Sequence, residues 1–274
     1  MTRRLCDLGS WGAALALSGA ATCCLADISV AVSDNTPPLA SRNWPEQGLG
    51  TAIVRDALAL QAPDENMRIL WPNGAAGPLE MLDEHRVELA LLVPRPGCQV
   101  EGNQATCALF HFSDPVIEIV WRIFVHHDRE FTYASPADLI GKQFCLADDT
   151  EGARWDDAPF GITATIPIDA KRTSRIEECF SLLRDAQVDA VIADEFSGVQ
   201  ALFDQNLTET VVPLPKPLGT QTLHVAASKS HWRATTLLYR VNAGLAELKQ
   251  SGAYQDLVAH HVERFWERLS LTAR

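Results

Sequence analysis

The sequence predicts an α/β fold made of two lobes. Two segments far apart in the chain, 82–93 and 183–194, share one pattern: a helix end and a short polar turn precede a continuous apolar run. An apolar run without polar alternation is typical of a parallel strand that is covered on both faces. The pattern occurs twice in 274 residues, a length that suits one large or two medium domains, so we expect two α/β units.

The first unit reads as alternating strands and helices. Pro78 suits the first turn of a helix and opens the second helix. Such an alternation implies right-handed crossovers and a parallel sheet. The expected elements are a strand at Ile28–Val32, a helix at Gly50–Gln61, a strand at Arg68–Trp71, a helix at Gly77–His85 and a strand at Val87–Val93.

The second unit follows a long β-rich segment. Val116–Val125 is longer than most strands, which suits a segment that passes between lobes, with the crossing near Pro115–Glu118. Ser135 is placed to cap a helical turn, and Ser174 and Glu177 have the spacing of a capping box. The expected elements are strands at Lys142–Ala147, Ile166–Asp169 and Val188–Asp194, and helices at Ser174–Asp185 and Phe196–Gln205.

The chain then returns to the first unit. Val211–Gly219 contains three prolines, which exclude it from the centre of a sheet, and we expect it to form the second crossing. A strand at Thr222–Ala227 and helices at His231–Lys249 and Gly252–Leu269 follow. The predicted division is therefore lobe 1 from residues 27–115 and 220–274, and lobe 2 from residues 116–219.

Residues 1–26 have the layout of a secretory signal. Arg3 and Arg4 precede the apolar stretch Leu8–Ala21, which is too short to span a bilayer, and small residues lead to Ala26. Cleavage after Ala26 predicts a periplasmic protein. A lipid anchor at Cys23 is the alternative, although the preceding Ala-Ala-Thr fits that motif poorly.

Four cysteines follow the predicted signal: Cys98, Cys107, Cys145 and Cys179. An even number in an exported chain indicates two disulfides, and three pairings are possible. Cys98 and Cys107 flank a polar loop that a bridge would close, which leaves Cys145 with Cys179. The segment 126–128, His-His-Asp, looks like a metal motif, but adjacent strand residues point to opposite faces, so we expect neither a metal site nor a cofactor.

The net charge of the chain and the position of one acidic residue, Asp194, limit the functional classes that fit the sequence. The formal net charge of −12 disfavours nucleic acids and anionic membranes as partners. In open α/β sheets the carboxyl ends of the strands face the ligand crevice, and the second apolar run ends there in Asp194. Asp194 is therefore the leading candidate for a ligand contact, with a helix cap or a surface acid as the alternatives.

Short motifs extend along nearly all of residues 27–262. They are Thr36-Pro-Pro-Leu39, Val87-Glu-Leu-Ala90, Phe112-Ser-Asp-Pro115, Leu139-Ile-Gly-Lys142, Val188-Asp-Ala-Val-Ile-Ala-Asp194 and Val241-Asn-Ala-Gly-Leu with Ser251-Gly-Ala-Tyr254. Each is weak alone, but in this order and spacing the chain resembles the periplasmic solute-binding proteins of the polar-amino-acid ABC importer type. The resemblance implies a two-lobed periplasmic-binding-protein type II fold, in which two strands form a hinge and the ligand is held between the lobes.

The resemblance also implies a function and a site. It implies a monomer that captures a small amine-bearing or amino-acid-like ligand for an ABC permease. In that family an acid at the place of Asp194 holds the ligand ammonium, which agrees with the strength of charge-assisted hydrogen bonds. The loop with Ser33, Asp34 and Thr36 and the strand end at Trp71 occupy positions that line the pocket.

Two positions depart from the family pattern. Members that bind amino acids have an arginine for the α-carboxylate where this chain has Thr106. Arg95 is the candidate to replace it as a bidentate partner, with a surface arginine as the other interpretation. In the other lobe a Gly-Thr pair is replaced by Asp149 and Thr150, both candidate ligand contacts, and this acidic rim favours an amine or cation over an ordinary amino acid.

Two other functional classes stay open. A periplasmic accessory or sensor protein that kept the fold without transport would explain the missing arginine and the cysteine-bounded loop beside the cleft. A dehydratase-like enzyme is the second, because acids and bases are available at Asp194, Glu195, His111 and His224. No nucleophile stands beside a base at a recognisable spacing, so the sequence favours a binding protein.

Overall fold

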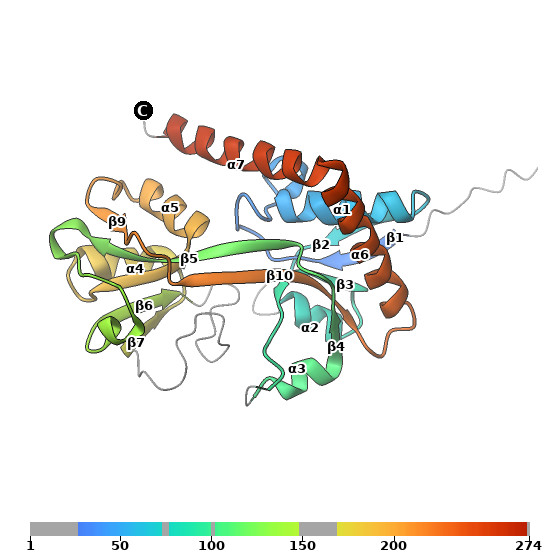
Figure 1. Ribbon diagram of the computed structural model, residues 1–274, viewed down its shortest axis with the longest axis horizontal. Helices are drawn as coiled ribbons and strands as arrows, with labels where there is room; N and C mark the ends of the chain where they lie inside the picture. Colours follow the sequence, from blue (N-terminus) through green and yellow to red (C-terminus); the bar gives the residue numbers. More distant parts are fainter. Residues whose placement is uncertain (1–26, 73–76, 100–101, 148–168, 273–274) are drawn as a thin grey trace, which may run out of the picture.

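The computed structural model describes residues 27–72, 77–99, 102–147 and 169–272, which form two α/β lobes joined by a pair of long strands (Figure 1). The fold class predicted from the sequence is confirmed. Within the described ranges, every helix is too short or too polar to cross a bilayer.

Lobe 1 is built on three parallel strands. Strand β1 lies between β2 and β3 and pairs in parallel with both, so the predicted alternation is confirmed. Helices α1 and α2 pack against β3, which is buried except at its last residue. The elements are β1 (Asp27–Ala31), η1 (Pro45–Gln47), α1 (Leu49–Gln61), β2 (Asn66–Leu70), α2 (Pro78–Asp83) and β3 (Leu89–Pro94).

Two antiparallel strands, β5 and β10, run side by side between the lobes (Figure 1). In lobe 1, β10 continues into pairs with β3 and β4, and in lobe 2, β5 continues into pairs with β8 and β9. The elements of this region are α3 (Gln104–Leu109), β4 (Phe110–Phe112), β5 (Ile117–His126), β8 (Ala190–Asp194), β9 (Val211–Pro213) and β10 (Gly219–Ser228).

The second crossing lies later in the chain than the sequence predicted. Val211–Gly219 was the expected crossing, but its first residues form the short strand β9 against β5, and β10 makes the passage. The prolines explain the difference because each lacks a backbone donor and is confined to short or edge strands. Strand β10 contains no proline and can pair continuously.

Lobe 2 repeats the arrangement of lobe 1. Strands β7, β6 and β8 pair in parallel in that order, and α4 packs against β6 and β8. Of the predicted strand at 166–169, only Asp169 falls within the described residues, where it begins β7. The elements are η2 (His127–Arg129), η3 (Pro136–Leu139), β6 (Gln143–Ala147), β7 (Asp169–Thr173), α4 (Ile176–Arg184) and α5 (Glu195–Asp204).

One of the two predicted caps is present. Ser135 and Asp138 form a reciprocal capping box on η3, so this turn is confirmed. The capping box at Ser174 is wrong: the N-cap of α4 is Arg175, without a side-chain cap bond. Glu177 pairs instead with Arg175 at 3.1 Å, so its carboxylate is turned toward a guanidinium.

The C-terminal helices α6 (Ala234–Ser251) and α7 (Ala253–Thr272) meet at Gly252, whose φ of 87° lies in the left-handed region that glycine adopts without strain. Helix α6 packs on α1 in lobe 1. Helix α7 then runs across the molecule until it reaches α5 of lobe 2 (Figure 1). The chain therefore connects the lobes a third time, through a helix rather than a strand.

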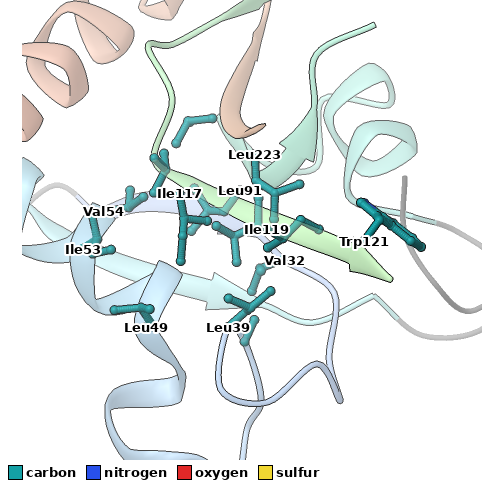
Figure 2. Packing of buried hydrophobic residues seen from close by; sticks show 14 of the residues in the cluster. Val32, Leu39, Leu49, Ile53, Val54, Leu91, Ile117, Ile119, Trp121 and Leu223 are labelled. Atoms are coloured by element: carbon teal, nitrogen blue, oxygen red, sulfur yellow. The ribbon is translucent and has the colours of Figure 1, made fainter. Parts of the chain in front are cut away.

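A continuous apolar core underlies the crossing strands. It extends from α1 through β5 to Phe144 and Ile192 of lobe 2. Trp121 is fully buried there (Figure 2). Its Nε1 donates to the Oε1 of Gln221 on β10 at 3.1 Å. Because this core spans both lobes, the region around the crossing strands is well packed.

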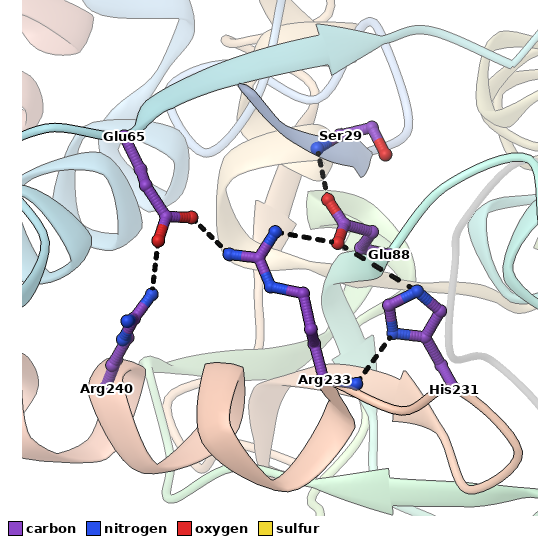
Figure 3. Close-up of polar contacts among 6 residues, drawn as sticks. All are labelled: Ser29, Glu65, Glu88, His231, Arg233 and Arg240. Carbon is purple, nitrogen blue, oxygen red and sulfur yellow. Dashed lines mark hydrogen bonds and ion pairs between the residues drawn. The ribbon is translucent and has the colours of Figure 1, made fainter. Parts of the chain in front are cut away.

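An arginine and glutamate network fixes α6 to the edge of lobe 1 (Figure 3). Arg233 bridges Glu65 and Glu88, and Arg240 donates to Glu65 at 2.6 Å. Glu88 also accepts from the backbone N–H of Ser29 at 3.2 Å. Burial alone would raise the pKa of Glu65, but hydrogen bonds from the two arginines lower it below its ordinary value.

Both disulfides have the predicted pairing. Cys98 and Cys107 are joined with a Cα–Cα distance of 5.8 Å, and Cys145 and Cys179 with one of 5.4 Å. The first closes an exposed loop beside α3, whereas the second ties β6 to α4 inside the core of lobe 2.

Candidate functional site

Asp194 ends β8 and begins α5. Its Oδ1 accepts from the backbone N–H groups of Phe196 at 3.1 Å and Ser197 at 3.0 Å, so the side chain caps the helix. The residue is only 6% exposed, and burial raises the pKa of its carboxyl above the ordinary value. The carboxylate is thus both a cap and a buried acid at the carboxyl end of a strand.

A small cavity of about 40 Å³ brings three predicted residues together. Ser33 and Thr36 of the loop after β1 face Asp194 and the adjacent Ser197 across it. A volume of this size holds little more than a water molecule. Most other residues around the cavity are apolar: Val32, Leu39, Leu92, Ile119 and Leu223.

A larger cavity of about 220 Å³ shares Thr36 and Ser197 with the first. It lies between the loop of lobe 1, helices α4 and α5 of lobe 2, and the end of α7. The sequence did not reveal Glu177, Gln200, Asp204 and Arg268 because they come from helix surfaces that meet only in the folded protein. The residues it adds are Asn35, Pro37, Ile176, Glu177, Gln200, Ala201, Asp204 and Arg268.

Among the described residues, three predicted contacts lie outside the linings of these two cavities: Asp34, Trp71 and Arg95. Asp34 forms an ion pair with Arg42 at 2.6 Å, and the Arg42 guanidinium lies 5.6 Å from the ring centroid of Trp71. Arg95 is exposed just beyond β3. Asp149 and Thr150 lie outside the described residues.

Two of the acids and bases of the enzyme alternative, Glu195 and His224, already have other partners. Glu195 pairs with Arg122 at 3.1 Å. The Nδ1 of His224 lies 2.8 Å from the carbonyl oxygen of Ser113, and burial lowers the pKa of this histidine. His111 is exposed on β4.

An apolar cluster joins the lobes beside the larger cavity, and we call it the interlobe cluster. Its residues from lobe 1 and α7 are Trp44, Phe265 and Leu269, and its residues from α5 are Phe196, Val199 and Phe203. The rings of Phe265 and Phe196 stand edge to face with centroids 5.2 Å apart. Trp44 is 4% exposed in this cluster, so it has a packing role.

His261 anchors the interlobe cluster through a hydrogen bond. Its Nδ1 accepts from the Nε1–H of Trp44 at 3.1 Å, which requires an unprotonated Nδ1. The ring is fully buried, with Glu46, His260 and Arg264 as its charged neighbours. Burial is the main reason why the pKa of His261 lies below its ordinary value.

Acid should therefore weaken the interlobe cluster. The folded pKa of His261 is lowered, so the unfolded chain takes up a proton first, and stability falls as the pH drops below about 6.5. His261→Asn keeps an acceptor for Trp44 without a titrating ring. Urea unfolding at about pH 7.5 and about pH 5.5 should show a smaller acid loss in this variant than in the wild type. Equal losses would exclude His261 as the source.

The fold and the interlobe cavities define a class of two-lobed α/β proteins with a ligand crevice between the lobes. No family model and no curated protein matches the chain. Solved structures do match over most of it. They include a histidine kinase sensor domain with similarity to periplasmic binding proteins, at 19% identity, a TM-score of 0.64 and coverage of 86% of this chain and 95% of that one.

Two further matches were solved with amino acids bound. One is an amino acid ABC transporter substrate-binding protein from Streptococcus pneumoniae with L-arginine, at 16% identity, a TM-score of 0.62 and coverage of 87% of this chain and 95% of that one. The other is the GluR0 ligand-binding core with L-glutamate, at 15% identity, a TM-score of 0.64 and coverage of 85% and 97%. At these identities the likeness shows the fold, the periplasmic-binding-protein type II fold expected from the sequence.

Proposed function

We propose that the protein captures a small amine-bearing or amino-acid-like solute between its lobes and delivers it to an ABC permease in the periplasm. One observation carries the proposal: Ser33 and Thr36 of lobe 1 face Asp194 and Ser197 of lobe 2 across one cavity. Residues 27–115 and 220–274 supply one side of the site and residues 116–219 the other. Residues 1–26 act as the export signal.

The charges around the cavities favour a ligand with an amine. Asp194, Glu177 and Asp204 contribute carboxylates, and the Arg268 guanidinium suits a ligand carboxylate. A buried carboxyl with a raised pKa is stabilised in its ionised form by a nearby cation. The amino acids bound in two structural neighbours support the same ligand class. Asp34, Trp71, Arg95, Asp149 and Thr150 stay predicted contacts at the mouth of the crevice.

Removing the charge of Asp194 should abolish binding without loss of the fold. Asn is an equally good N-cap, so Asp194→Asn keeps the hydrogen bonds to Phe196 and Ser197. The empty variant should melt at or above the wild-type temperature because a buried carboxylate is removed. Thermal shifts with a panel of amino acids, amines and polyamines should show stabilisation of the wild type only.

Two further variants test this interpretation. Asp194→Ala also removes the cap and should lose about 1 kcal/mol in the free energy of unfolding. Glu209→Gln changes the same formal charge at an exposed position outside both cavities and should bind as the wild type does. If Asp194→Asn binds the same compound with unchanged affinity, Asp194 is only a helix cap.

The interlobe cluster favours a second candidate, a periplasmic sensor or accessory protein. Apolar contacts between α5 and α7 join the lobes directly, which a transport receptor that opens and closes does not require. A sensor domain is among the proteins with this fold. If no compound in the thermal-shift panel raises the melting temperature of the wild type, this candidate is supported over solute transport.

A further inference from the structure

The structure contradicts the reason for expecting no metal at His126, His127 and Asp128. The sequence placed the two rings on opposite faces of a continuing strand, but β5 ends at His126 and η2 begins at His127. The change of backbone stacks the two rings with centroids 5.0 Å apart and an interplanar angle of 19°. One ligand atom from each of the three residues lies within 4.8 Å of the others.

The hydrogen bonds of both rings leave the facing nitrogen atoms unprotonated. The Nδ1 of His127 lies 3.1 Å from the carbonyl oxygen of Thr210, which can only accept, so Nδ1 carries the proton and Nε2 carries the lone pair. The Nδ1 of His126 is also unprotonated, but its lone pair accepts from the backbone N–H of Asp128 at 3.2 Å, so a metal ion would have to replace this hydrogen bond. The bond from His127 Nδ1 to Thr210 is of the outer kind that orients the histidine ligands of metal sites.

The carboxylate of Asp128 lies beside both rings. Asp128 Oδ1 lies 3.0 Å from His127 Nε2, and Asp128 Oδ2 lies 3.9 Å from His126 Nδ1. Among the described residues, the ion-pair partners of Asp128 are these two histidines. His127 Nε2 and the Asp128 carboxylate are therefore close enough to share a metal ion.

We propose that His126, His127 and Asp128 bind a divalent transition metal such as Zn²⁺ or Ni²⁺. Two imidazoles and one carboxylate form a ligand set that these ions prefer over Mg²⁺ and Ca²⁺. With metal–nitrogen bonds of about 2.0–2.1 Å, neighbouring ligands of a tetrahedral ion stand about 3.3 Å apart. The site therefore closes when the exposed Asp128 side chain moves and the His126 ring turns its Nδ1 away from the Asp128 N–H. The three protein ligands leave one position for water or another molecule.

The scaffold of the site is rigid and separate from the interlobe cavities. His126 pairs with Val211 of β9, and the backbone N–H of His127 donates to the Thr210 carbonyl at 2.8 Å. The site thus lies at the lobe 2 end of β5, next to β9, where none of its residues lines either cavity. Its test is therefore independent of the proposed solute binding.

Calorimetric titration of the full-length, tag-free protein with Zn²⁺ and with Ni²⁺ tests the proposal. The wild type should bind one equivalent, and His127→Ala, His126→Ala and Asp128→Asn should each weaken binding at least tenfold. His111→Ala removes an exposed histidine elsewhere and should bind as the wild type does. Circular dichroism confirms that each variant is folded.

Spectroscopy with Cu²⁺ provides a second readout that a purely structural role would not change. Electron paramagnetic resonance of the wild type should show coupling to two imidazole nitrogens, and His127→Ala should show one fewer. The proposal is overturned if the wild type binds none of the three ions, or if the variants bind them as tightly as the wild type. In that case the three side chains form only a surface cluster held by hydrogen bonds.

Discussion

Phe265→Ala is expected to lower the free energy of unfolding by about 3–5 kcal/mol, the usual range for a buried phenylalanine. The ring is fully buried and packs against Trp44 and Phe196, with centroid distances of 6.3 Å and 5.2 Å. Its loss leaves a cavity at the point where α7 reaches α5. Urea unfolding would measure the stability, and small-angle scattering should show a larger radius of gyration as the lobes separate.

Trp266→Ala is the matched control for this prediction. The next residue on the same helix is 42% exposed and lies outside the interlobe cluster. Its removal should cost much less and leave the scattering profile unchanged. Equal losses in both variants would mean that the helix as a whole, and not its contact with lobe 2, was weakened.

Removing the disulfide between Cys145 and Cys179 is expected to cost about 3.8 kcal/mol. This value is the free-energy contribution of the loop-closure entropy at about 25 °C, for the separation of 34 residues between the two cysteines. Both cysteines are fully buried against Phe180, so the alanine double variant also loses packing. Urea unfolding should therefore show a strongly destabilised lobe 2.

The disulfide between Cys98 and Cys107 provides the comparison. Its separation of 9 residues corresponds to about 2.6 kcal/mol by the same entropy estimate, and it closes an exposed loop. The alanine double variant at this bridge should retain more stability than the variant at Cys145 and Cys179. The opposite order would show that the loop next to α3 is more important for folding than its exposure indicates.

Much of the fold was predictable from the sequence because its signals are local. Continuous apolar runs such as Leu89–Val93 and Ala190–Ala193 have a single stable environment, a buried parallel strand. Proline and glycine mark where elements begin and end. The cysteine spacing was sufficient to predict the disulfide pairing, since Cys98 and Cys107 flank one short polar loop and leave Cys145 to pair with Cys179.

The candidate site was predictable only where a strand end fixed its position. Ser33, Thr36 and Asp194 follow strands and meet at one cavity, as the topology of parallel sheets requires. Arg268 was not predictable because its position depends on the direction in which α7 leaves Gly252. The orientation of the rings of His126 and His127 was predicted wrongly for a related reason. Whether the strand ends before or after His127 decides whether the two side chains diverge or stack, and the sequence does not fix a strand end to one residue.

The pairing of β5 with β10 has a consequence for motion. The ladder from Trp121 and Gly219 to Ile117 and Leu223 joins the same two strands that carry each lobe. A rotation of one lobe about a single peptide would break interstrand hydrogen bonds, whereas a gradual change of twist along both strands preserves them. We therefore expect the lobes to move by twisting the two-stranded ladder, and the side chains that pack along β5 and β10 limit the amplitude of this twist.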